Sequence, residues 1–173
     1  MRIKPILFLI IWTQLSVLLS GCLFVSEEQI IDDTERAVKD AFLADPTEAT
    51  EETDSLSLYV PEKMDMADAT EYNLVLQDGD QTYLLFFNPL EEDASRLLYE
   101  SANKNDVLID STFQSEEQFG YVVAVPYNDD GQYELIVGLG GKRISTVSEK
   151  RNLAEDAGLM MEMVRSISYK QND

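Results

Sequence analysis

The strongest constraint on the fold is a change, from Leu56 onward, to side chains that alternate along the chain. Leu56, Leu58 and Val60 alternate with Ser57 and Tyr59 directly before a proline. A period of two is typical of a strand with one buried face, and proline ends such a strand. The same alternation predicts further strands at residues 72–76, 81–87, 107–112, 120–125, 132–138 and 143–147.

Two of the links between these strands carry the signature of a tight turn. Asp78-Gly79 joins one pair of strands, and the run from Asn128 to Gly131 joins another. Glycine accepts the positive φ that a hairpin turn requires. Because links this short favour antiparallel pairing, the sequence predicts an antiparallel sheet.

The first predicted helix covers residues 26–44. Ser26 and Gln29 form a capping-box pattern, and apolar residues then recur at three- and four-residue spacing. Pro46 ends the helix, because the residue before a proline avoids helical backbone angles. Residues 47–54 are rich in acid and have no large aliphatic side chain, so they predict a solvated linker.

Two more helices are predicted further along the chain. One covers residues 91–101, where three acidic residues at its start suit the positive end of the helix dipole. The other covers about residues 149–168, with Thr146 and Glu149 as its capping box. Two of the three methionines in this last helix fall on its apolar face, which predicts a core-filling role.

Together these elements predict an α+β fold, in which the N-terminal and C-terminal helices cover an antiparallel sheet. The terminal helices are expected to cover its two faces, as an α/β/α sandwich. The element order over about residues 55–169, from Val60-Pro61 to a helix ending near Arg165-Ser166-Ile167, resembles the PsbP-like fold of small exported bacterial proteins. That resemblance implies a binding or assembly module and supplies no functional residue.

The N-terminus has the layout of an export signal. Arg2 and Lys4 precede a largely apolar stretch over residues 6–19. As a helix, this stretch is about 21 Å long, which is shorter than the roughly 30 Å core of a bilayer. A cleaved signal peptide is therefore favoured over a permanent span.

The sequence Leu19-Ser20-Gly21-Cys22 follows directly and resembles the lipobox of bacterial lipoproteins, Leu-[Ala/Ser/Thr]-[Gly/Ala]-Cys, at all four positions. The resemblance implies cleavage between Gly21 and Cys22 and attachment of diacylglycerol to Cys22. The alternatives are an ordinary cleaved signal and an uncleaved anchor helix. We therefore divide the chain into a signal peptide (1–21), a lipidated N-terminus with a helix and acidic linker (22–54), and a globular domain (55–173).

Charge and composition exclude several function classes. The chain has 33 acidic and 13 basic residues, a net charge of -20, which argues against nucleic acid as a partner. It contains no histidine and one cysteine, so His-dependent nucleophiles, His-ligated zinc and intramolecular disulfides are excluded. The sequence thus predicts a non-enzyme without a cofactor or metal, attached to membrane lipid through acylated Cys22.

Two glycine-containing patterns are partly similar to known binding motifs. An EF-hand loop around Gly79 or Gly131 fails, because its first ligand position would hold Leu74 or Pro126. A phosphate loop ending at Lys142 fails because no glycine stands at the required spacing. A compact basic spot remains as the candidate contact for a protein partner: Gly140, Gly141, Lys142 and Arg143.

These observations predict a non-catalytic binding or assembly module, held by lipid on the outer face of the cytoplasmic membrane. Two alternatives stay open: a lipoprotein that binds a small molecule or cation, and a cell-envelope hydrolase that uses carboxylates. The first alternative requires a defined cavity, and the second requires a cleft in which two carboxylates converge.

Overall fold

The first helix begins where the sequence predicts. The computed structural model describes residues 26–170, and its first element, α2, spans Glu27–Leu43. Ser26 is the N-cap, and its side chain accepts a hydrogen bond from the Gln29 backbone N–H at 3.1 Å. The apolar face predicted for this helix is buried, with Val38 and Phe42 in the core.

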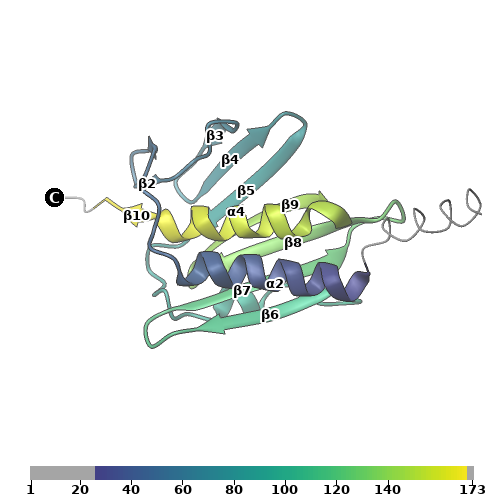
Figure 1. The fold of residues 1–173 in the computed structure, drawn as a ribbon. Coiled ribbons are helices and arrows are strands. Elements are labelled where there is room, and N and C mark those ends of the chain that lie inside the picture. The colour runs from purple at the N-terminus through teal and green to yellow at the C-terminus, as the bar shows by residue number, and fades with distance from the viewer. Residues whose placement is uncertain (1–25, 171–173) are drawn as a thin grey trace, which may run out of the picture.

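The centre of the fold is a seven-stranded sheet in which all neighbours are antiparallel, as predicted (Figure 1). From one edge to the other its strands are β3 (Asp65–Ala69), β4 (Asn73–Asp78), β5 (Gln81–Phe87), β9 (Lys142–Glu149), β8 (Gln132–Leu139), β7 (Phe119–Pro126) and β6 (Ile109–Gln114). Both predicted hairpin turns are present, with Gly79 and Gly131 at positive φ. β3 was not predicted from the sequence.

A second, small sheet lies at one end of the molecule. It consists of β1 (Glu51–Glu52), β2 (Leu56–Leu58) and β10 (Ser168–Tyr169), with β2 in the middle. The acidic segment predicted as a linker therefore contains a short, exposed strand. The pairing of β10 with β2 places the last described residues next to the segment that follows α2.

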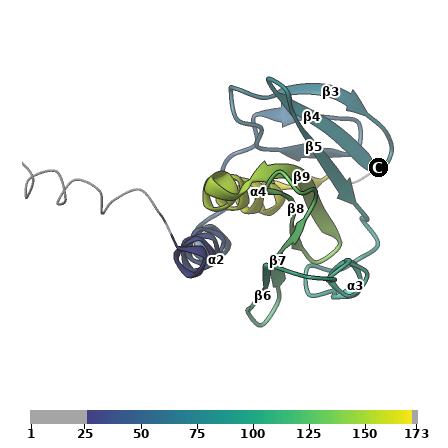
Figure 2. The ribbon, with the colours of Figure 1, turned by 90° about the vertical axis from the view of Figure 1, so that its right-hand side faces the viewer.

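The two terminal helices lie side by side on the same face of the large sheet (Figures 1 and 2). α4 spans Leu153–Ser166 and lies over β8 and β9, whereas α2 lies over β6 and β7. The α+β class and the two covering helices are confirmed, but the prediction of one helix on each face is wrong. A methyl group at Gly158 would lie 3.3 Å from Cβ of Ala37, so this glycine allows the helices to pack closely.

The opposite face of β7 and β8 is covered by the segment between β5 and β6 (Figure 2). This segment contains the short helix α3 (Leu97–Glu100), and Leu98 and Tyr99 within it pack on a second apolar cluster. The cluster consists of Phe119, Tyr121, Val123, Val125 and Ile136.

The helix predicted over residues 91–101 is therefore only one turn long. The Asp93 backbone C=O accepts a hydrogen bond from the Phe119 N–H at 2.8 Å, and its carboxylate pairs with Lys142. These tertiary contacts hold the preceding residues in turns rather than in a helix. Leu97, the first residue of the turn, is 59% exposed.

The last helix starts later than the sequence predicts. β9 extends to Glu149, and a 3-10 turn, η1 (Lys150–Asn152), precedes α4. The predicted capping box is wrong, because Thr146 lies within β9 and its hydroxyl donates to the Thr82 C=O at 2.8 Å. The core-filling role predicted from the two methionines on the apolar face is confirmed, and the third methionine is fully buried as well.

α2 shares one hydrophobic core with the residues from position 55 onward. Val38 and Phe42 belong to the same buried cluster as Leu56 on β2 and Met160 on α4.

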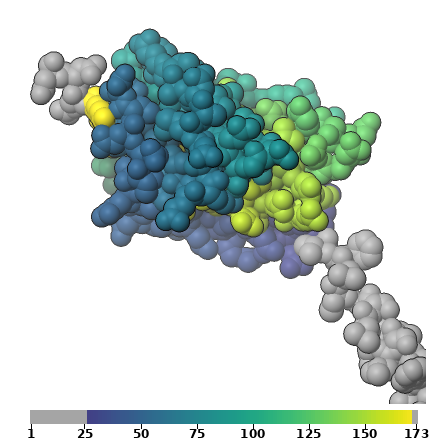
Figure 3. Space-filling view, turned by 90° about the horizontal axis from the view of Figure 1, so that it is seen from above, coloured from purple at the N-terminus to yellow at the C-terminus, as the bar shows by residue number. Residues whose placement is uncertain are grey.

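β3 and β4 lie above α4 in Figure 2, and Figure 3 shows that β1–β5, in blue to teal, form the surface beside α4. The lipobox predicted at residues 19–22 lies outside the described residues.

Candidate functional site

The basic spot predicted as a partner contact lies mostly in the interior. Gly140 and Gly141 form the two-residue turn between β8 and β9, and the backbone of residues 88–93 crosses directly over them. Lys142 is 4% exposed, and its Nζ lies 2.7 Å from Oδ1 of Asp93. Its charge is therefore neutralised within the chain. This part of the predicted contact needs correction, because three of its four residues are buried.

Arg143, the fourth residue, is partly exposed on the sheet face opposite α4. Its guanidinium lies 5.8 Å from the centroid of the Phe86 ring. The neighbouring Leu84 is 45% exposed on this face. Of the four residues predicted as the partner contact, Arg143 is therefore the one whose side chain is open to solvent, and it lies beside an apolar surface.

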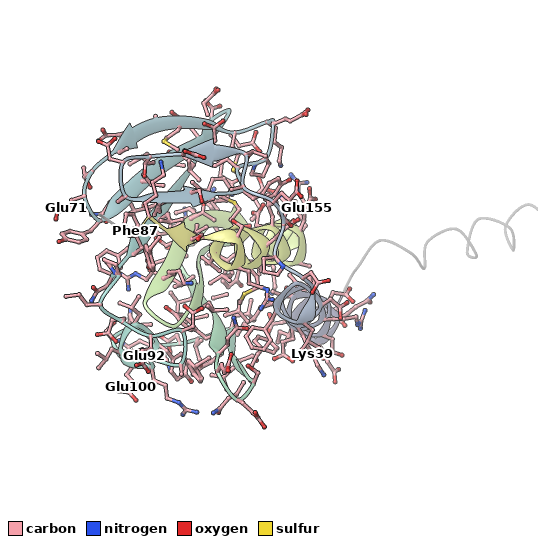
Figure 4. The ribbon with its side chains drawn as sticks, turned by 90° about the vertical axis from the view of Figure 1, so that its left-hand side faces the viewer. Lys39, Glu71, Phe87, Glu92, Glu100 and Glu155 are labelled. Carbon is pink, nitrogen blue, oxygen red and sulfur yellow. The ribbon has the colours of Figure 1, made fainter. Side chains whose placement is uncertain are left out.

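A wide hollow lies between α2 and the edge strand β6, and we call it the α2–β6 groove. It is open and has a volume of about 810 Å³. Figure 4 shows Lys39 on α2, on the side of the sheet opposite Glu92 and Glu100. The groove is lined by Asp32, Glu35, Arg36, Lys39, Phe42, Leu43, Asp110, Ser111, Thr112, Phe113 and Gln114.

At the floor of the groove, α2 and β6 are in direct contact with each other. The rings of Phe42 and Phe113 lie 6.1 Å apart between their centroids. The Ser111 hydroxyl donates a hydrogen bond to the Glu35 carboxylate. These two contacts fix the distance between α2 and β6, so the groove has a defined width.

The backbone of β6 is half unpaired within the described sheet, because β6 is an edge strand. In the turn that joins it to β7, the Ser115 N–H donates to the Gln118 C=O at 3.0 Å. Antiparallel pairs alternate between bonded and non-bonded residues, so Phe113, opposite Gly120, bonds to β7. The N–H and C=O groups of the even-numbered residues 110, 112 and 114 therefore point away from β7.

The side chains of two of these even-numbered residues are held on the α3 side. Asp110 accepts a hydrogen bond from the Tyr99 hydroxyl at 3.0 Å and lies 3.4 Å from Nζ of Lys104. Gln114 accepts one from Arg96 at 2.9 Å. Burial lowers the pKa of Lys104, but its hydrogen bond to Tyr99 and the charge of Asp110 outweigh this and raise the pKa overall. Lys104 therefore stays positively charged and neutralises Asp110.

A second polar cluster lies under the first turn of α4, around Asp156, which is 7% exposed. Its carboxylate accepts hydrogen bonds from the hydroxyls of Ser148 at 2.6 Å and Tyr83 at 3.3 Å, and from the Gln81 amide at 3.2 Å. Burial and the Asp156 charge raise the pKa of Tyr83, so the phenol remains a donor. Because the carboxylate is saturated by the protein's own donors, this cluster ties α4 to β5 and β9.

The groove was not found by sequence reasoning. Its helical wall was predicted, but which strand lies at the edge depends on strand order, for which the sequence carried no signal.

Three tyrosines lie along the β7–β8 hairpin, and they differ in exposure: Tyr121 is buried, Tyr133 is partly buried and Tyr127 is exposed.

No protein-family model matches the sequence, and a search of curated proteins returns no match. Within residues 26–170, no helix is both long and apolar enough to cross a bilayer. Over the same residues, no three His, Cys, Asp or Glu side chains are grouped in a way that would hold a metal ion.

Proposed function

We propose that this chain is a lipid-anchored binding module on the outer face of the cytoplasmic membrane, which acts through protein–protein contact without catalysis. The observation that carries the anchor is the sequence Leu19-Ser20-Gly21-Cys22 directly after a positively charged and then apolar leader. Removal of residues 1–21 deletes two basic residues and no acidic one, so the exported part is even more acidic than the whole chain. Acyl chains, rather than attraction to anionic headgroups, then hold it at the membrane.

The start of the folded domain supports this arrangement. α2 begins at Glu27, only five positions after Cys22. Residues 22–26 reach at most about 18 Å when fully extended, because each residue spans at most about 3.5 Å. An acylated Cys22 would therefore hold the N-terminal end of α2 close to the bilayer surface.

The α2–β6 groove supports the binding role. It is open along an unpaired strand edge, and its width is fixed by contacts inside the chain. Exposed edges of this kind bind extended peptide segments through their main chains.

Cys22→Ser is expected to abolish lipid attachment, because the serine hydroxyl replaces the thiol that carries the diacylglycerol. We expect cells fed an alkyne fatty acid to label the unmodified chain and to leave the variant without detectable label. Ser20→Ala is the matched control, since alanine also fits the second lipobox position, and it should keep full labelling. Equal labelling of the Cys22→Ser chain would contradict the anchor.

A further inference from the structure

We propose that an extended, basic segment of a partner protein pairs with β6 as an additional strand and fills the α2–β6 groove. This inference rests on the proposed function, because it names the partner chemistry and the surface of the same binding module. The first support is the backbone of β6. At residues 110, 112 and 114 the N–H and C=O groups lack a neighbouring strand in the described sheet, which makes them a template for strand addition.

The other edge of the sheet, β3, is built differently. It carries exposed Asp65 and Asp68, and its register with β4 shifts between Met66 and Asp68. Charged residues and bulges are the devices by which proteins prevent strand addition at an edge. β6 pairs with β7 in regular register, and its one carboxylate, Asp110, is already paired with Lys104. Strand addition is thus blocked at β3 and open at β6.

The side chains that line the groove indicate which side chains the added strand of the partner should have. Leu43, which is 67% exposed, forms an apolar end together with Phe42 and Phe113. Asp32 and Glu35 lie further toward the start of α2. In an added strand, alternate side chains face α2, so an apolar residue and a lysine or arginine on that side match these walls.

Two cations also line the groove, but they do not reverse this preference. Both Arg36 and Lys39 are exposed, and Arg36 is paired with Asp33 at 3.0 Å on its own helix, which offsets its charge locally. The long-range field follows the net charge of the chain, which is -20. Such a field attracts a basic segment and repels a second copy of the chain.

The test uses the full chain in detergent micelles and a six-residue peptide of alternating lysine and valine as the probe. Amide hydrogen exchange is measured residue by residue by NMR. We expect the peptide to slow exchange at the N–H groups of residues 110, 112 and 114 by about tenfold or more, with no change on β3. A peptide with glutamate in place of lysine, and one N-methylated at alternate residues, should both fail to protect these amides.

Thr112→Pro tests the same contact from the protein side. Proline removes an N–H that points away from β7, so the ladder to β7 is kept and the bond to the added strand is lost. We expect peptide affinity to fall about tenfold or more, whereas Thr112→Val, which keeps the N–H, should bind as the unmodified chain does.

Several outcomes would overturn the proposal. Equal binding of the N-methylated peptide, or protection of β3 instead of β6, would show that no strand is added at this edge. Protection of β6 that rises with protein concentration in the absence of peptide would identify a second copy as the occupant. The Cys22→Ser chain keeps the groove and should bind the peptide, so failure of the anchor and failure of this inference are distinguishable.

Discussion

Asp156→Ala is expected to lower the free energy of unfolding by about 3 kcal/mol, because two buried donors and one partly buried donor lose their acceptor. The hydroxyls of Ser148 and Tyr83 and the amide of Gln81 all donate to this carboxylate. The substitution also removes a link between α4 and strands β5 and β9. Chemical denaturation followed by circular dichroism measures the change.

Glu155→Ala is the matched control for this prediction. Glu155 precedes Asp156 in the first turn of α4 and interacts equally with the helix dipole, but its side chain is exposed (Figure 4). We expect this variant to lose no more than about 0.5 kcal/mol, as is usual for a surface substitution. A similar loss in the two variants would mean that the buried hydrogen bonds contribute little.

Gly140→Ala is expected to cost more than about 3 kcal/mol, because it combines backbone strain with a steric clash. Gly140 has φ of +56°, and a Cβ there would lie 2.5 Å from Cα of Asp93. That neighbour is backbone, and its segment is fixed by the Asp93–Lys142 ion pair and by the hydrogen bond from Phe119. The segment over residues 88–93 must therefore move to make room.

Gly79→Ala separates strain from clash. Gly79 has φ of +58° in the same kind of two-residue turn, but nothing lies within 4 Å of the position of its Cβ. This variant carries the left-handed strain alone, about 1 kcal/mol. Thermal unfolding of the two variants side by side measures the difference, and equal losses would contradict the close crossing at Gly140.

The parts of the fold that were predictable depend on local signals. The cap at Ser26 and the glycine turns at Gly79 and Gly131 each depend on neighbours within a few residues, and each appears as predicted. The prediction of a helix over residues 91–101 was wrong in length, because Asp93 is held by Phe119 and Lys142, which are distant in sequence.

β3 was missed for a related reason. Its residues are mostly exposed, so Asp65–Ala69 shows no apolar alternation. Its strand conformation comes from pairing with β4, which does alternate. Similarly, the placement of both terminal helices on one face brings Gly158 close to Ala37, a contact that neither residue reveals alone.

The candidate site depends on strand order more than on any motif. β9 inserts between β5 and β8, so the segment from residue 88 to residue 108 crosses the sheet and leaves β6 at the edge. The same crossing buries Lys142, which the sequence had presented as a surface cation. Local composition therefore predicted a basic contact, whereas the tertiary structure presents a half-unpaired strand beside α2.

We propose above that the mature chain is anchored through Cys22 and presents its folded domain next to the membrane. The most direct measurement is mass spectrometry of the N-terminal peptide from protein extracted from membranes. We expect the peptide to start at Cys22 and to carry the mass of a thioether-linked diacylglycerol. A peptide that starts at Met1, or one whose Cys22 carries no lipid, would contradict it.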